Sequence, residues 1–176
     1  MAHFDAAAAE CLVFTYKEGL LSALAHDLKI RVTKFRIDVD ERTRTIEAWF
    51  DAASLRVVCA MTDGAEARGT LTAENKREIE ANIVRDVLEA RMHPDIRFVS
   101  TSVQETGERY VIKGTLSLHG KTRQLTVPVQ RNGERYVAEA RIRQPDFGIQ
   151  PYRAMLGTLK VQSTVSVRVT LTVPPR

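Results

Sequence analysis

The sequence predicts a mainly β protein: a single antiparallel, lipocalin-like β-barrel of about eight strands with one amphipathic helix over about residues 73–90. Three observations predict it. The C-terminal segment alternates apolar and polar residues, a series of strand-like segments is joined by short turns, and one stretch has helical spacing. A chain of 176 residues is most simply one domain, large enough to bury a core or enclose a cavity. We therefore assign residues 1–176 to one domain with a short N-terminal extension over 1–9.

The C-terminal segment has the clearest pattern. From Leu159 to Val173 every second residue is apolar except Ser163, and the residues between them are polar. Successive side chains of a strand point to opposite faces, so this segment has one dry face and one solvated face. Fully extended it would reach roughly 50 Å, and a strand of that length must bend. Such a strand is typical of a barrel wall with an apolar interior.

Strand-like segments also fill the chain before the helix. They are Leu12–Lys17, Leu28–Asp40 and Thr43–Phe50. Within the second of them the apolar positions change phase, from Ile30 and Val32 to Phe35 and Ile37. A one-residue phase change is what a β-bulge produces, so we expect one long, bent strand there.

The segments after the helix predict a meander. They are Ile96–Val103, Arg109–Leu118, Gln124–Gln130, Arg135–Arg143 and the terminal strand. The links between them are short, and Asn132–Gly133 is a strong hairpin signal because both residue types tolerate positive φ. Five strands joined in this way are expected to pair in sequence order.

Residues 73–90 carry the helix. Ile79, Ile83 and Val87 lie four residues apart and form one apolar stripe. Thr72 is suited to cap the N-terminus, and Pro94 prevents the helix from continuing into the next strand. A helix of this kind can cover an enclosed site, although any packed helix has an apolar stripe.

Composition disfavours several functional classes. The net charge is only +4, and no Lys/Arg block with interleaved aromatic residues is present, so we expect no nucleic-acid partner. No basic leader and no 18-residue apolar stretch is seen, which predicts a cytoplasmic protein without stable membrane insertion. Cys11 and Cys59 lack metal-ligand spacing and are expected to be buried free thiols.

Histidines are the main candidates for chemistry. His26 precedes Asp27, and on an extended chain the two side chains point to opposite faces and cannot form a dyad. His26 either marks a cavity mouth or belongs to a turn in which the pair satisfies local backbone groups. His26, His93 and His119 could in principle form a three-histidine metal site, but their spacing gives no support, so we expect no metal and no cofactor.

No nucleophile motif or phosphate-binding loop is present, so we expect no catalytic residue. Phe147–Ile149 forms, with Pro151 and Tyr152, a small apolar cluster before the terminal strand. The cluster either caps a cavity or packs as a corner.

Three stretches resemble the YceI-like family of polyisoprenoid-binding, lipocalin-type proteins. They are Gly19–Asp27 with its glycine-to-His-Asp run, the strand entry His93–Thr101, and the hairpin Tyr110–Thr122 with Gly114 and Gly120. The resemblance extends over roughly residues 10–173. It implies an antiparallel barrel whose interior holds a long apolar amphiphile, often in a homodimer, and it implies no enzyme activity.

These observations together predict non-catalytic binding, transport or storage of an isoprenoid or fatty-acyl-type lipid. Two alternatives remain at this stage: an enzyme acting on an apolar substrate with His26 as acid or base, and a structural or interaction module with a solid interior. For the lipid-binding hypothesis, the ligand-contacting candidates are His26, Phe35, Ile37, Phe50, Phe98, Leu116, Phe147, Val165, Val167 and Val169.

Overall fold

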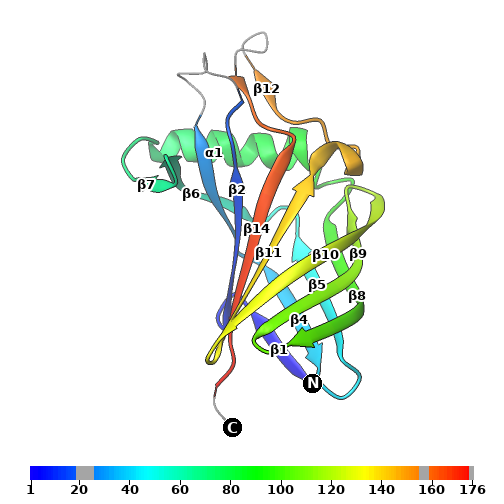
Figure 1. The fold of residues 1–176 in the computed structure, drawn as a ribbon. Coiled ribbons are helices and arrows are strands. Elements are labelled where there is room, and N and C mark those ends of the chain that lie inside the picture. Colours follow the sequence, from blue (N-terminus) through cyan, green and yellow to red (C-terminus); the bar gives the residue numbers. More distant parts are fainter. Residues whose placement is uncertain (19–25, 155–158, 175–176) are drawn as a thin grey trace.

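Twelve strands form one antiparallel sheet in the computed structural model, which describes residues 1–18, 26–154 and 159–174 (Figure 1). The strands of this sheet are β1 (Ala2–Asp5), β2 (Ala9–Thr15), β3 (Asp27–Val32), β4 (Phe35–Asp40), β5 (Thr45–Asp51), β6 (Leu55–Thr62), β7 (Ala65–Ala67), β8 (Asp95–Thr106), β9 (Arg109–Leu118), β10 (Lys121–Asn132), β11 (Arg135–Arg143) and β14 (Thr164–Thr172). Two short strands, β12 (Arg153–Ala154) and β13 (Leu159–Lys160), pair separately.

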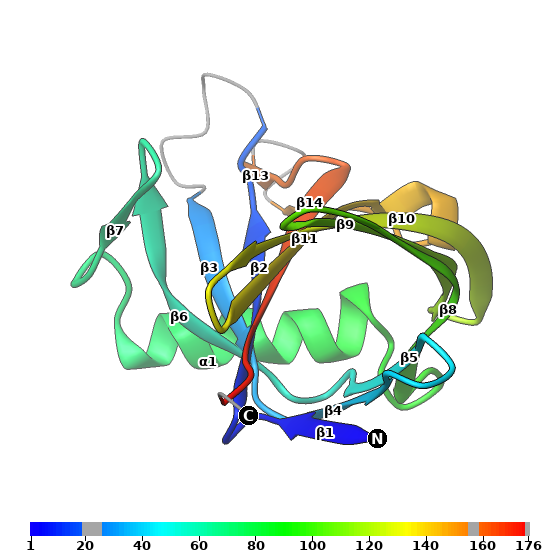
Figure 2. The ribbon, with the colours of Figure 1, turned by 60° about the horizontal axis from the view of Figure 1, so that its bottom comes forward.

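The sheet curls around an interior but does not close (Figure 2). Its order is β1-β4-β5-β8-β9-β10-β11-β14-β2-β3-β6-β7, so β1 and β7 each have one paired neighbour among the described residues. The mainly β, antiparallel, lipocalin-like prediction is confirmed. The expectation of a barrel of about eight strands needs correction, because the strand count is higher and the sheet is open.

The expected meander is confirmed. β8, β9, β10, β11 and β14 are successive neighbours in the sheet. In the β10–β11 hairpin Asn132 pairs with Arg135, and Gly133 adopts a φ of 65°. Only a glycine reaches that conformation without a steric cost, which explains the turn at this position.

The predicted long strand Leu28–Asp40 is two strands instead. β3 pairs with β2 and β6, whereas β4 pairs with β1 and β5, so the chain turns a corner between them. At that corner the backbone N–H and the hydroxyl of Thr33 both donate to the carbonyl oxygen of Ser54. The phase change in the sequence marks this corner. The bulge lies in β6, where Val58 is the extra residue opposite Lys29 and Ile30 of β3.

The terminal segment is also interrupted. β13 ends at Lys160 and β14 begins at Thr164, so the expected single strand Leu159–Val173 is wrong in its first third. The interruption contains Ser163, whose carbonyl oxygen accepts the backbone N–H of Gln144. Four strands, β1, β6, β7 and β12, were not predicted, and β1 lies within the expected extension 1–9.

The helical region is α1 (Ala73–Asn82) followed by a π-helical turn, η1 (Ile83–Val87). Thr72 caps α1 as predicted: its hydroxyl accepts the N–H of Asn75, and the side chain of Asn75 accepts the N–H of Thr72. No helix in the described ranges is both long and apolar enough to cross a membrane. A 3-10 turn, η2 (Gln144–Phe147), connects β11 to the segment before β12.

Candidate functional site

A cavity of about 1100 Å³ lies inside the curled sheet. Its wall is built from residues of β1 to β6, β8 to β11 and β14, with residues of η1 on one side. The volume is slightly above the range of typical ligand pockets, roughly 300–1000 Å³. The hypothesis of a solid interior is therefore wrong.

The wall is apolar because alternate residues of each strand face inward. On β14 these are Val165, Val167, Val169 and Leu171. On β8 the inward face changes from Ile96 and Phe98 to Val103 and Glu105, because the register with β9 shifts between Ser100 and Ser102.

Charged residues of the wall gather at one end of the cavity. They come from the β4–β5 turn and from the tips of the β8–β9 and β10–β11 hairpins, near the two chain termini in Figure 1. The residues are Asp40, Glu41, Arg44, Glu105, Arg131 and Glu134. Glu41, Arg44, Glu105, Arg131 and Glu134 are exposed, so the cavity reaches solvent here, and we call this end the mouth.

Contacts between side chains order the mouth. The guanidinium of Arg44 lies 3.7 Å from Glu105, and the hydroxyl of Tyr110 donates to Glu105 at 2.9 Å. Burial, and next the Glu105 carboxylate, raise the pKa of Tyr110, so this hydroxyl remains a hydrogen-bond donor at neutral pH. Arg131 lies over the ring of Tyr136, 5.6 Å from its centroid. The mouth thus presents both signs of charge and two phenol groups.

The opposite end of the cavity is covered by helical turns. Ile83, Val87 and Leu88 of η1 and its C-terminus face the cavity there, together with Ile149. We call α1, η1 and the following Leu88 together the lid. The hydroxyl of Thr15 is buried in this part of the wall and has no hydrogen-bond partner among the described residues. A ligand reaching this inner end would meet almost only apolar atoms.

Seven of the ten predicted contact residues line the cavity. They are Ile37, Phe50, Phe98, Leu116, Val165, Val167 and Val169. The other three do not. Phe35 is buried beside Phe50, with ring centroids 5.8 Å apart. Phe147 is buried in an apolar cluster with Phe98 and Leu116. Ile83 and Val87 were predicted as part of the apolar stripe of a covering helix, but not as ligand contacts. The charged mouth was not predicted, although antiparallel hairpins place alternate turns at the same end and could have indicated it.

His26 does not line the cavity either. It is half-buried, immediately before β3, and within the described residues it has no hydrogen bond to a carboxylate. Its neighbour Asp27, the first residue of β3, accepts the backbone N–H of Lys17 at 2.7 Å. The apolar stretch Gly19–Ala25 lies outside the described residues. The geometry required for His26 as an acid or base toward a cavity-bound substrate is therefore not found.

The two cysteines are free and buried, as predicted. Cys11 lines the cavity from β2. Burial, with a smaller contribution from Glu10, raises the pKa of its thiol to about 12. The thiol is therefore protonated and unreactive at neutral pH.

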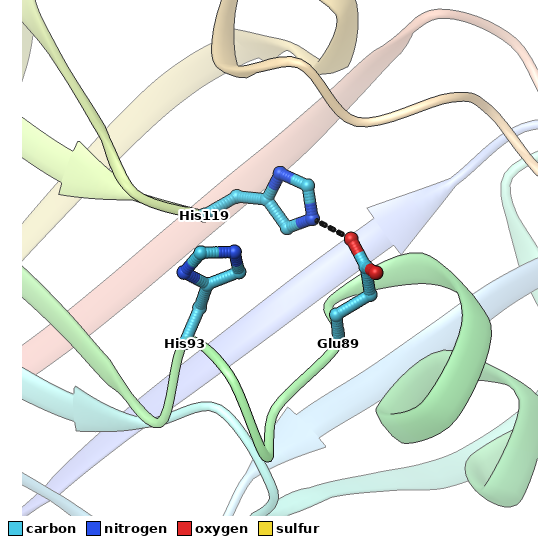
Figure 3. Close-up of side chains that lie close together, drawn as sticks. All are labelled: Glu89, His93 and His119. Carbon is cyan, nitrogen blue, oxygen red and sulfur yellow. Dashed lines mark hydrogen bonds and ion pairs between the residues drawn. The ribbon is translucent and has the colours of Figure 1, made fainter.

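A second group of polar side chains lies beside the lid (Figure 3). Glu89, just after η1, His93 and His119 each place a donor atom within 4.8 Å of the others. His119 Nε2 lies 2.6 Å from a carboxylate oxygen of Glu89, and the rings of His93 and His119 have centroids 4.6 Å apart. His26 is not part of the group, so the structure joins two of the three histidines considered from the sequence and adds a glutamate.

Comparison with protein families gives one match that spans nearly the whole chain. A family model for the YceI-like domain matches residues 5–173. A comparison with curated proteins finds no match to the sequence.

Solved structures with the same fold are similar over most of their length. The crystal structure of Burkholderia cenocepacia BcnA has a TM-score of 0.66 at 18% identity, covering 97% of this chain and 99% of that one. A polyisoprenoid binding domain from Saccharophagus degradans, implicated in plant cell wall breakdown, has a TM-score of 0.60 at 13% identity, with 99% of each chain covered. The Campylobacter jejuni YceI protein has a TM-score of 0.56 at 14% identity, covering 84% and 86%. At these identities the likeness establishes the fold alone.

Proposed function

Because the chain belongs to the YceI-like family, we propose that its cavity binds a long apolar amphiphile, of the isoprenoid or fatty-acyl class, without converting it chemically. The observation that carries the proposal is the apolar wall of a cavity of about 1100 Å³. The description of the Saccharophagus degradans domain as polyisoprenoid binding supports the same ligand class. Transport or storage of the ligand is the role that fits such a site.

The driving force for binding is the removal of the ligand tail from water. Each methylene group that enters an apolar environment contributes about 0.8 kcal/mol. The wall offers few polar atoms between the mouth and the lid, so the gain accumulates along the tail with little dependence on its chemical details. This explains how a site without directed polar contacts achieves affinity and accepts a class of tails.

The distribution of charge along the cavity sets the orientation of the ligand. The tail extends toward Ile83, Val87 and Leu88 at the lid, and the polar headgroup stays at the mouth. There it meets the Arg44–Glu105 pair and the hydroxyl of Tyr110. A headgroup buried at the lid end would lose its hydration without comparable partners, which costs several kcal/mol for a charged group.

Two variants test the proposal. Val167→Arg places a guanidinium inside the cavity, and Val99→Arg makes the same change at an exposed position on the outer face of β8. We expect mass spectrometry of an organic extract to find an amphiphile with the wild type and with Val99→Arg, and to find much less with Val167→Arg. A fluorescent fatty-acyl probe should follow the same order of affinity.

Circular dichroism and thermal unfolding verify that both variants are folded. Retention of wild-type probe affinity by a folded Val167→Arg protein would contradict the proposal. So would repeated recovery of wild-type protein that neither carries an amphiphile nor binds the probe.

A further inference from the structure

The group of Glu89, His93 and His119 lies outside the cavity and plays no part in the proposed lipid binding. The three residues come from two places in the chain. Glu89 and His93 belong to the segment between η1 and β8, and His119 belongs to the β9–β10 turn (Figure 3). β8 and β9 are antiparallel neighbours, so the residue before one and the residue after the other meet at the same end of the sheet.

The two ring nitrogens of His119 have different partners. Nδ1 lies 3.2 Å from the carbonyl oxygen of Phe147, and a carbonyl oxygen only accepts, so Nδ1 carries a hydrogen. Nε2 lies 2.6 Å from an oxygen of the Glu89 carboxylate. Nε2 and this oxygen, two potential metal-ligand atoms, therefore already lie next to each other.

The Phe147 contact is the arrangement that prepares a histidine for metal binding. A metal-ligating imidazole commonly donates its second N–H to a backbone carbonyl, which fixes the ring orientation and the tautomer. His119 has this partner already, and its side chain is only 11% exposed. Nε2 is then the nitrogen left for the metal.

His93 supplies the second imidazole from the other side. Its ring is packed against Gly120, where a Cβ atom would come within 2.9 Å of Cε1. Any larger residue at position 120 would push the ring away, so the glycine keeps His93 next to His119. The Glu89 side chain is half exposed, which leaves a path from solvent to the three donors.

We propose that Glu89, His93 and His119 bind one divalent transition-metal ion of the Zn²⁺ type. Two imidazoles and one carboxylate are ligands that suit Zn²⁺, whereas Mg²⁺ and Ca²⁺ prefer all-oxygen sites. Small side-chain rotations bring the three donor atoms to coordination distance, and water completes a four-coordinate site.

The position of the site gives the metal a structural effect. Glu89 follows Leu88 of the lid and His119 follows Leu118 of β9, and both leucines line the cavity. A metal held by both segments ties the inner end of the lid to the meander. Because the metal binds the folded chain, it raises the unfolding temperature.

Calorimetric titration of the untagged, metal-free protein with ZnCl₂ tests the proposal. We expect one Zn²⁺ per chain and an unfolding temperature that rises with Zn²⁺ concentration. His93→Gln should weaken binding by about 100-fold or more and Glu89→Gln by at least about 10-fold, since even outer-shell changes at metal sites cost 10–100-fold. Neither variant removes the His119–Phe147 contact, so both should fold.

His3→Gln is the matched control, because His3 pairs with a carboxylate, that of Asp38, but has no second imidazole beside it. It should bind Zn²⁺ with wild-type affinity. Absence of saturable one-to-one binding, or wild-type affinity in both His93→Gln and Glu89→Gln, would overturn the proposal. Lipid binding by the cavity does not depend on the result, since none of the three residues lines it.

Discussion

Glu80 of α1 accepts the backbone N–H of Val57 in β6, with 3.0 Å between nitrogen and carboxylate oxygen. Val57 pairs with Ile30 of β3 on one side, but β7 extends along the other side only from Ala60 to Thr62. The carboxylate thus takes the place of a strand neighbour at this edge of the sheet. An unpaired backbone N–H at a partly buried site is costly, so this bond both satisfies β6 and fixes the lid.

Removal of this acceptor should destabilise the protein. Glu80→Ala leaves the Val57 N–H without its partner, and we expect a loss of about 1–3 kcal/mol in the free energy of unfolding. Glu80→Gln keeps an acceptor oxygen in the same position and should lose much less. Urea unfolding of the three proteins measures the difference. Equal stability of Glu80→Ala and the wild type would mean that water replaces the carboxylate.

Gly114 of β9 lies under the ring of Phe98. A Cβ atom at position 114 would come within 2.4 Å of the Val99 carbonyl oxygen and 2.5 Å of Phe98 Cζ. We expect Gly114→Ala to cost about 1–3 kcal/mol, as overpacking in a core usually does. Because Phe98 lines the cavity, the same change should also weaken binding of a fluorescent fatty-acyl probe.

Gly107→Ala is the control for that experiment. Gly107 has a positive φ of 62°, but no atom lies within 4 Å of the added Cβ, and the residue does not line the cavity. The Gly107→Ala variant should lose about 1 kcal/mol in its free energy of unfolding because of backbone strain, and its probe binding should be unchanged. If Gly114→Ala matched the wild type in both stability and binding, the close approach of Phe98 would be refuted.

The buried thiol of Cys11 predicts a pH dependence. In the fold its pKa is raised to about 12, whereas in the unfolded chain it ionises near 9. Between these values the unfolded state loses a proton that the folded state keeps, so the free energy of unfolding falls as pH rises. The wild type should lose up to about 1.4 kcal/mol per pH unit more than Cys11→Ala between pH 9.5 and 11. Identical pH profiles for the two proteins would contradict the burial of this thiol.

The sequence predicted elements whose pattern has a local cause. The alternation in Thr164–Thr172 follows from the two-residue period of a strand, so the inward set Val165, Val167 and Val169 could be named in advance. The cap at Thr72 depends on residues three positions apart and was equally accessible. Leu55–Thr62 was missed because it lacks strict alternation: Val57, Cys59 and Ala60 are all buried, so apolar residues occur on both faces.

Features that depend on pairing partners could not be predicted. A phase change such as that near Phe35 fits both a bulge and a corner, and only the partners of β3 and β4 distinguish the two. Phe35 and Phe50 face each other across one strand pair, yet only Phe50 reaches the cavity. The proximity of His93 and His119 depends on the matched lengths of β8 and β9, which no motif spacing expresses.

The affinity of the lipid-free protein for a series of amphiphiles with one headgroup and increasing tail length tests the central claim most directly. Titrations stay below the concentration at which each amphiphile forms micelles. We expect each added methylene to tighten binding by up to about fourfold, the equivalent of about 0.8 kcal/mol, until the tail fills the cavity of about 1100 Å³ and the affinity levels off. An affinity that does not change with tail length would contradict the binding of an apolar tail in the cavity.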